Sequence, residues 1–244
     1  SYLVCGTGLG KLHVWHITLH DGVDDSSDDT WERVATLDAH VRGCAIYSLV
    51  FAAGKGGEVM LLSGADEEIR GWRWADCLAA FKKAGKNKTP PAMPAPLLRL
   101  ENPRTGLRRG ALGQLSETCA LAVDASAGLL YSAAGDGNAY AWDLTTHKCV
   151  ATYGGGGEPL HCLTLCPKRK QLVTGGEDGC VRLWDVRTAQ CDHVITPASL
   201  GDGARKGGSA DGVSGGGGGG WCGCVAVDEA ETWLVAGWGD GFLC

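Results

Sequence analysis

The chain has 244 residues, 44% of them hydrophobic, and a formal net charge of −6 at pH 7. This composition supports a substantial core, and the acidic balance argues against a domain built for nucleic-acid binding, where a pI above about 9 is usual. No apolar run approaches the roughly 20 residues that span a membrane, so we expect no membrane partner.

A short unit recurs along the chain, and most of its copies contain a tryptophan near the end. In the first copy, residues 2–17, a strand-like segment leads to a turn at Gly10 and then to a second strand with Trp15. The later copies cover 59–74, 129–144, 171–187 and 233–244. In three copies an aspartate precedes the tryptophan by six residues: Asp66 before Trp72, Asp136 before Trp142, and Asp178 before Trp184.

Each later copy also has an apolar segment upstream, at 44–51, 118–123, 160–165 and 222–227, which gives four strands per repeat, a to d in chain order. Trp142 and Trp184 are 42 residues apart, the length of one four-stranded propeller blade. We therefore predict an all-β fold, a WD40 β-propeller. Residues 1–244 are expected to form a single incomplete propeller of about five blades, the first and last clipped, from a seven-bladed parent protein.

The repeat has a physical explanation, because one four-stranded sheet cannot bury both its faces and blades must cover one another. A tryptophan on strand c supplies the apolar plate between sheets. An aspartate in the b–c turn, a Ser or Thr on strand b and a histidine before strand a are predicted to hold it. These blade contacts are His40, Ser63, Asp66, Trp72, Ser132, Asp136, Trp142, Thr174, Asp178 and Trp184. Ser63 lies one residue closer to its aspartate than its counterparts do, and blades three and four lack the histidine.

We interpret these groups as hydrogen-bonded structural contacts rather than as catalytic residues, because buried polar groups must be paired. No nucleophile–base pair or carboxylate pair stands in a recognisable catalytic arrangement. We therefore expect no enzymatic activity, no cofactor and no small-molecule substrate.

The 12 cysteines form no C-x-x-C pair, and their closest spacings are Cys162/Cys166 and Cys222/Cys224. Most stand where a strand would accept Ala or Val, so we interpret them as small buried hydrophobic residues in a reducing compartment. His13 and His16 lie on opposite faces of a strand, and no metal site is expected.

Three insertions interrupt the blades. Residues 20–32 form an acidic loop with five Asp and one Glu. Residues 75–117 form a basic, proline-rich insertion around strand d of blade two, with a short helix over 75–84. Residues 197–220 are glycine-rich and predict a disordered tether.

Propeller topology places the a–b and c–d connections on one rim, and the b–c and d–a connections on the other. Two basic clusters should therefore share a rim: Lys82, Lys83, Lys86 and Lys88 in a c–d insertion, and Lys168, Arg169 and Lys170 in an a–b turn. Such a rim could attract an acidic partner or an RNA backbone. The alternative is that both clusters are ordinary solvated loops.

Several segments resemble the THO complex subunit 6 family. The most specific is SGADEEIRGWRWADCL at 63–78, with its second tryptophan and helical continuation; the others are GTGLGKLHVWHI at 6–17, LHCLTL at 160–165, VTGGEDGCVRLWDVRTAQ at 173–190 and GWCGCVAV at 220–227. The resemblance implies a non-catalytic scaffold in the nucleus. It would dock other THO/TREX subunits and couple mRNA transcription and processing to export. Direct RNA contact through the basic clusters is a separate, secondary hypothesis.

A second interpretation is a substrate receptor or adaptor of another assembly, such as a cullin-type ubiquitin ligase. The segment WDVR at 184–187 gives a partial match to a W-D-x-R pattern. That match is frequent by chance in WD40 repeats, because an arginine there also serves the c–d turn.

Overall fold

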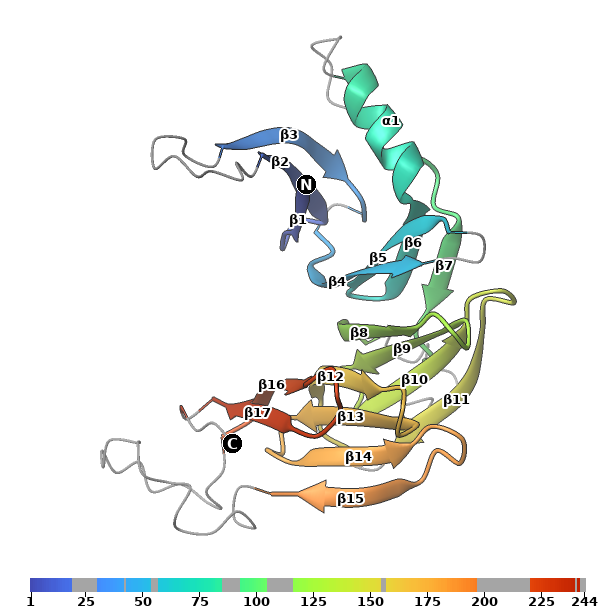
Figure 1. The fold of residues 1–244 in the computed structure, drawn as a ribbon, viewed down its shortest axis with the longest axis vertical. Helices are drawn as coiled ribbons and strands as arrows, with labels where there is room; N and C mark the ends of the chain where they lie inside the picture. The colour runs from blue at the N-terminus through green and yellow to red at the C-terminus, as the bar shows by residue number, and fades with distance from the viewer. Residues whose placement is uncertain are drawn as a thin grey trace, which may run out of the picture.

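The structure, a computed structural model, describes residues 1–18, 30–41, 43–53, 57–84, 93–104, 116–154, 157–196, 220–239 and 241, without the side chains of 82–84. The strands in these ranges form five antiparallel sheets that follow one another along an arc (Figure 1). Each sheet is a run of neighbouring strands in chain order, as predicted for propeller blades.

Blade one has three described strands: β1 (Tyr2–Gly6), β2 (Lys11–Thr18) and β3 (Thr30–Asp38). Blade two has β4 (Ile46–Ala53), β5 (Val59–Ala65), β6 (Glu68–Arg73) and β7 (Leu98–Glu101), with helix α1 (Trp74–Ala84) between the last two strands. Blade three has β8 (Thr118–Asp124), β9 (Leu129–Ala134), β10 (Asn138–Asp143) and β11 (Lys148–Gly154). Blade four has β12 (Leu160–Cys166), β13 (Gln171–Gly176), β14 (Val181–Asp185) and β15 (Cys191–Ile195). Blade five has β16 (Cys222–Val227) and β17 (Leu234–Trp238).

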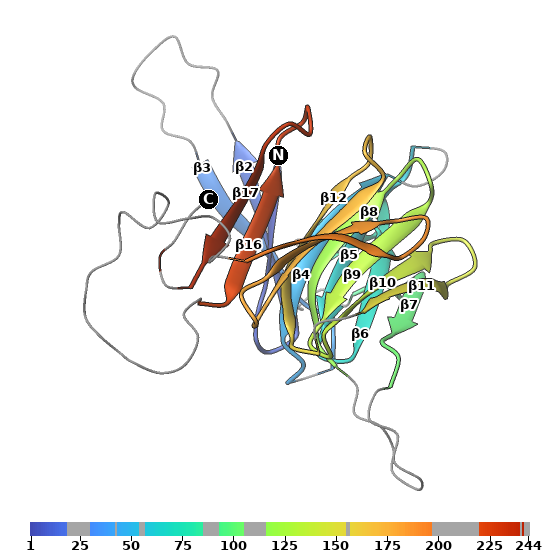
Figure 2. The same ribbon diagram turned by 90° about the horizontal axis from the view of Figure 1, so that it is seen from below.

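The first strands of blades two to five lie next to one another, β4 beside β8, β8 beside β12, and β12 beside β16. Strands run from one end of the molecule to the other, so that their connections collect at two opposite rims (Figure 2). This arrangement gives the two rims that the sequence predicts. Among the described residues, no helix has the length and apolar character needed to cross a membrane.

The core consists of separate apolar layers, one between each pair of neighbouring blades. In each layer the tryptophan of one blade packs on the blade before it: Trp72 on Leu12 and Val14, Trp142 on Leu62 and Ile69, and Trp184 on Tyr131 and Tyr153. The last layer joins blades four and five, with Trp238 packed among residues that include Val173 and Val181.

The predicted insertions overlap regular structure at their edges. Strand β3 begins at Thr30, so the last three residues of the predicted acidic loop 20–32 belong to a strand, while 19–29 lie outside the described residues. Within 75–117 the structure places α1 and the fourth strand of blade two, β7. Helix α1 packs Cys77 and Phe81, four residues apart, into the layer between blades one and two. Residues 85–92, 105–115 and 197–219 lie outside the description.

The tryptophan layers predict a large stability difference between two tryptophan-to-alanine variants. Trp184 is 3% exposed, so Trp184→Ala should lower the free energy of unfolding by about 3–5 kcal/mol. Trp233 is 74% exposed, and Trp233→Ala should stay within about 0.5 kcal/mol of the parent. Urea unfolding followed by tryptophan fluorescence measures both, and equal losses would refute the layered core.

Candidate interaction rims and their polar contacts

Blades three and four hold their tryptophans through a hydroxyl on the neighbouring strand. Trp142 donates its indole N–H to Ser132 Oγ, and Trp184 donates to Thr174 Oγ1, each at 2.9 Å. Both hydroxyl residues are fully buried, so each indole N–H has its partner inside the sheet.

Blade two differs from this arrangement. Trp72 donates its indole N–H to the Pro94 carbonyl oxygen at 3.1 Å, rather than to Ser63. The Ser63 hydroxyl instead lies 2.6 Å from His40 Nε2. Blade two has this histidine, and the next two blades lack it. The histidine therefore occupies the Ser63 hydroxyl, and a carbonyl of the proline-rich segment after α1 accepts the Trp72 indole N–H instead.

The predicted turn aspartates do not hold the tryptophans directly. Asp136 accepts from the Asn138 backbone N–H at 3.0 Å and from the Tyr140 hydroxyl at 2.5 Å. Asp178 accepts from the Cys180 backbone N–H at 3.0 Å and from the Arg182 guanidinium at 2.5 Å. Each acid thus closes its own b–c turn against strand c. This corrects the expected acid–tryptophan link.

Asp66 makes a different contact. Its carboxylate accepts from the Ala45 backbone N–H and from the Tyr47 hydroxyl, each at 2.8 Å, so it joins the turn to strand β4 of the same blade. The hydrogen bond to Asp66 raises the pKa of Tyr47 to about 12, because the phenol donates to a carboxylate.

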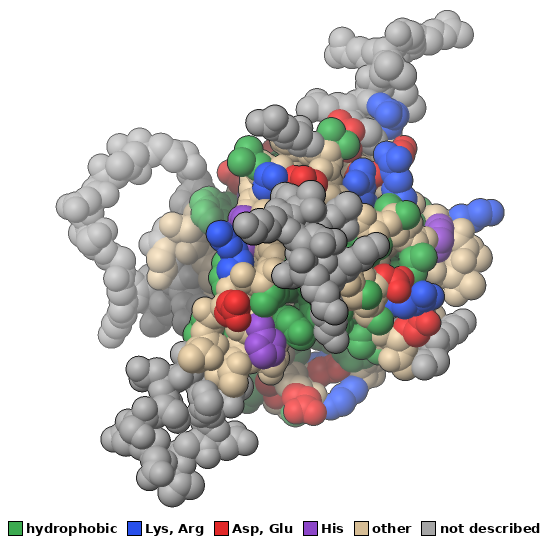
Figure 3. All heavy atoms as spheres, turned by 90° about the horizontal axis from the view of Figure 1, so that it is seen from above, with side chains coloured by type: hydrophobic (Ala, Val, Ile, Leu, Met, Phe, Trp, Pro, Cys, Tyr) green, Lys and Arg blue, Asp and Glu red, His purple; other side chains and the backbone are tan. Residues whose placement is uncertain are grey.

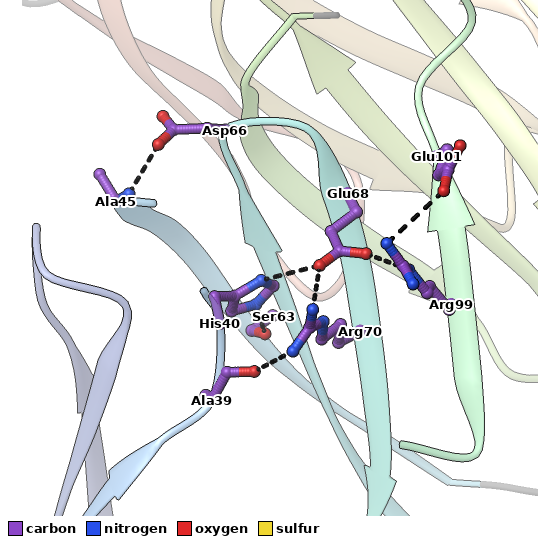
Figure 4. A network of polar contacts seen from close by, with 9 residues as sticks. All are labelled: Ala39, His40, Ala45, Ser63, Asp66, Glu68, Arg70, Arg99 and Glu101. Atoms are coloured by element: carbon purple, nitrogen blue, oxygen red, sulfur yellow. Dashed lines mark hydrogen bonds and ion pairs between the residues drawn. The ribbon is translucent and has the colours of Figure 1, made fainter. Parts of the chain in front are cut away.

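Glu68, which the sequence analysis did not single out, takes the position beside His40. Figure 4 shows its carboxylate between His40, Arg70 and Arg99. Arg70 donates to Glu68 Oε1 at 2.5 Å, Arg99 donates to Oε2, and His40 Nδ1 lies 3.7 Å from Oε1. A second Arg70 nitrogen donates to the Ala39 carbonyl at 2.8 Å.

One signal in the sequence could have identified Glu68. Ser63 precedes Asp66 by three residues, whereas Ser132 precedes Asp136 by four. The strand register is otherwise equivalent, with Ser63 opposite Arg70 as Ser132 is opposite Tyr140. With the shorter turn, Asp66 bonds to Ala45 and Tyr47, and Glu68, two residues further along at the start of strand c, lies beside the histidine.

His40, Ser63 and Glu68 have the residue types of a hydrolase triad, but their surroundings do not support that role. Ser63 is fully buried within the sheet, so a substrate cannot reach its hydroxyl. A pocket of about 130 Å³ borders His40 and Glu68, below the roughly 300 Å³ at which ligand pockets usually begin. Within the described ranges, no group of three or more His, Cys, Asp or Glu side chains could hold a metal ion.

Burial, and after it the nearby Arg70 charge, lower the pKa of His40 to about 4, while the Glu68 and Asp66 charges partly oppose both effects. The folded protein thus favours the neutral ring. In the unfolded chain the same histidine titrates near 6.5. Stability from His40 is therefore complete above about pH 6.5 and is lost as the pH falls toward 4.

Because of this titration, the free energy of unfolding should change with pH, and the His40 side chain should cause most of the change. Between pH 7 and pH 5 the His40 contribution to the free energy of unfolding should fall by about 2 kcal/mol. Urea unfolding at several pH values should show this slope in the parent chain and a flatter one in His40→Gln. His161→Gln, which removes a half-buried histidine paired with Glu177, is the matched control and should keep most of the slope. An unchanged slope in His40→Gln would contradict the assignment.

The basic turn at 168–170 contacts blade five through one lysine side chain and two backbone N–H groups. Lys168 Nζ donates to the Glu229 carbonyl oxygen at 2.6 Å. The backbone N–H groups of Lys168 and Arg169 both donate to the buried Glu231 carboxylate, each at 2.9 Å. The turn therefore joins blade four to blade five.

The other predicted basic positions lie in helix α1 and in the segment that follows it. Lys82 and Lys83 belong to α1, but their side chains, like residues 86 and 88, lie outside the described part. On the face seen in Figure 3, basic and acidic side chains are interspersed rather than separated. Arg187, the arginine of the WDVR segment, pairs with Asp185 of its own turn at 2.7 Å.

The contact between blades four and five can be tested at two neighbouring glutamates. Glu231→Ala leaves two backbone N–H groups without their carboxylate and should lower the free energy of unfolding by about 3 kcal/mol. Glu229 contributes its backbone carbonyl, so Glu229→Ala should change stability by less than about 0.5 kcal/mol. Thermal and urea unfolding of both variants would measure the difference. A harmless Glu231→Ala would show that this turn does not hold the blades.

Comparison with known proteins supports the fold. A model of the WD40 family (WD domain, G-beta repeat) matches residues 147–185, which run from strand d of blade three through strand c of blade four. The crystal structure of the WD40 β-propeller domain of Doa1 superposes with a TM-score of 0.58 at 18% identity, covering 99% of this chain and 59% of that one. The predicted WD40 β-propeller class is confirmed.

Similar curated proteins point to one family among those with the WD40 fold. THO complex subunit 6 of Arabidopsis thaliana is 34% identical over 191 residues, which are 76% of this chain and 46% of the relative. THO complex subunit 6 of Homo sapiens is 27% identical over 239 residues, 98% of this chain and 59% of the relative. The chain thus spans about half the length of the curated relatives that it matches.

Proposed function

Because the chain belongs to the THO complex subunit 6 family, we propose that it is a non-catalytic scaffold of a nuclear THO/TREX-like complex that couples mRNA transcription and processing to nuclear export. The observation that carries this proposal is the similarity to human THO complex subunit 6 along 98% of the chain. The fold alone would not carry it, because WD40 propellers are platforms for many functions.

The scaffold role is consistent with where the polar groups lie. The Ser, His and Asp side chains that could be mistaken for catalytic residues form hydrogen bonds within and between blades. Ser63 is buried against His40, and Asp136 and Asp178 close their own turns. The blades offer their rims and their outer strands to solvent, and partner subunits are the ligands that such surfaces fit.

We place one partner-docking surface on the a–b and c–d rim of blades one and two, where aromatic rings cluster. The Trp74 ring lies 5.8 Å from Tyr2 and 5.1 Å from Phe51, both edge to face. Tyr2 is 39% exposed and Phe51 is 45% exposed, while Trp74 also contacts the buried Phe81. Exposed aromatic side chains held in place from below are typical of protein–protein contacts.

A direct RNA contact stays a secondary proposal. Lys168 donates its ammonium to the Glu229 carbonyl, so the turn at 168–170 offers RNA less free charge than the sequence suggests. The cullin-adaptor interpretation has lost its motif-based support, because Arg187 pairs with its own turn.

Affinity purification from nuclear extract tests both the family role and the docking surface. The chain should recover other THO subunits, and the Tyr2→Ala/Phe51→Ala variant should recover at least ten-fold less. Val150→Ala/Val194→Ala removes two exposed apolar side chains from the outer strands of blades three and four, and should recover the parent amount.

The outcomes separate the two parts of the proposal. If the folded parent chain recovers a cullin adaptor and no THO subunit, the scaffold assignment is wrong. If the aromatic variant is folded by circular dichroism and recovers the parent amount, the docking surface lies elsewhere and the family role stands.

A further inference from the structure

From blade two onward, the first strands of neighbouring blades approach each other closely at an equivalent position. At this position they lie over the second strand of the earlier blade. Between blades two and three this position is polar: Ser48 donates its hydroxyl to the Thr118 carbonyl at 3.2 Å, above Gly64. A Cβ on Gly64 would lie 2.5 Å from Ser48 Oγ and 2.6 Å from Thr118 Cγ2. The glycine therefore makes room for the pair.

Between blades three and four the same position is apolar. Ala120 stands opposite Ala133, as Ser48 stands opposite Gly64, and Leu160 begins the next first strand. All three belong to the apolar layer of that junction.

Between blades four and five the position holds two thiols. Cys162 stands opposite Gly175 in the register, and Cys222 begins the first strand of blade five. A Cβ on Gly175 would lie 2.5 Å from Cys222 Sγ and 2.7 Å from Cys162 Sγ. Gly175 thus makes room for the thiols as Gly64 does for the hydroxyl and methyl groups.

The two sulfur atoms lie 4.0 Å apart, in van der Waals contact, and both residues are buried. Cys162 Sγ is also within 3.7 Å of the carbonyl oxygens of Gly175 and Cys222. In the described part of the chain, which includes eleven free cysteines, this is the only contact between two thiols.

We propose that Cys162 and Cys222 form an oxidation site, at which a hydroperoxide converts the two thiols into a disulfide that joins blade four to blade five. Hydrogen peroxide is the simplest oxidant of this class and is small enough to enter a packed junction during local opening. The crosslink would connect residues 60 positions apart in sequence.

The chemistry starts at the thiol that ionises more easily. A hydrogen bond from Cys162 lowers the pKa of Cys222, and the same contact raises the pKa of Cys162. The Cys222 thiolate, its proton released to solvent, attacks one oxygen of the peroxide, so the O–O bond breaks and a sulfenic acid and hydroxide form. The hydroxide takes the proton of Cys162 and becomes water.

In the second step the Cys162 thiolate attacks the Cys222 sulfur. The S–S bond forms, the S–O bond breaks, and the departing hydroxide takes up a proton to give a second water. Two thiols and one peroxide thus yield one disulfide and two waters, with the peroxide reduced by two electrons. A thiol reductant reverses the crosslink by exchange.

The test uses the full chain, purified with reductant, desalted and exposed to hydrogen peroxide at a temperature well below unfolding. Peptide mass spectrometry should find Cys162 linked to Cys222, and the count of free thiols should fall from 12 to 10. The thermal unfolding midpoint should rise by about 5 °C or more, because the crosslink constrains the unfolded chain, and return after reduction.

Matched variants make the result specific. Cys222→Ser and Cys162→Ser should each abolish the linked peptide and the reversible rise of the unfolding midpoint. If one of the two variants does not fold, the other still tests the proposal. Cys166→Ser removes another buried thiol from β12, and should keep both signals. The proposal is overturned if the folded parent yields no Cys162–Cys222 peptide, if linkage appears only above the unfolding midpoint, or if the midpoint rises equally in Cys222→Ser.

Discussion

The structure depends on tryptophan side chains packed between successive sheets. A four-stranded sheet has two apolar faces, and each tryptophan on a third strand covers part of the sheet before it, as Trp142 and Trp184 do. Because every blade needs its neighbours, the sheet faces between blades are buried, and the connections collect at two rims. Binding surfaces must therefore be built from connections and strand ends rather than from a cleft within one sheet.

Around this constant packing, the polar contacts vary from blade to blade. Blades two to four each pair an acid near the b–c turn with the residue two positions before the tryptophan: Glu68 with Arg70, Asp136 with Tyr140, and Asp178 with Arg182. A turn shorter by one residue is enough to change which carboxylate does this in blade two. The junctions between first strands vary in the same way, from hydroxyl and carbonyl groups through methyl groups to thiols.

These observations bear on how a propeller acquires a function. The buried histidine, serine and carboxylate of blade two are held by one another and by two arginines, and this stabilises the region between blades one and two. The aromatic rings at the opposite rim are supported from below by helix α1, which the insertion after strand c provides. The family relationship gives this surface its proposed partners, and the geometry explains why an insertion at that place suits docking.

The amino-acid sequence by itself determined the class of fold, the order of the strands and the positions of the tryptophan layers, because these follow from local alternation, turn residues and a 42-residue spacing. It also indicated the helix after Trp72. It did not determine partners: Trp72 donates to Pro94, Lys168 and Arg169 meet Glu231, and Cys162 meets Cys222. Those pairs join residues 22 to 63 positions apart, so only tertiary packing, within a blade or between blades, decides which polar groups come within hydrogen-bond distance.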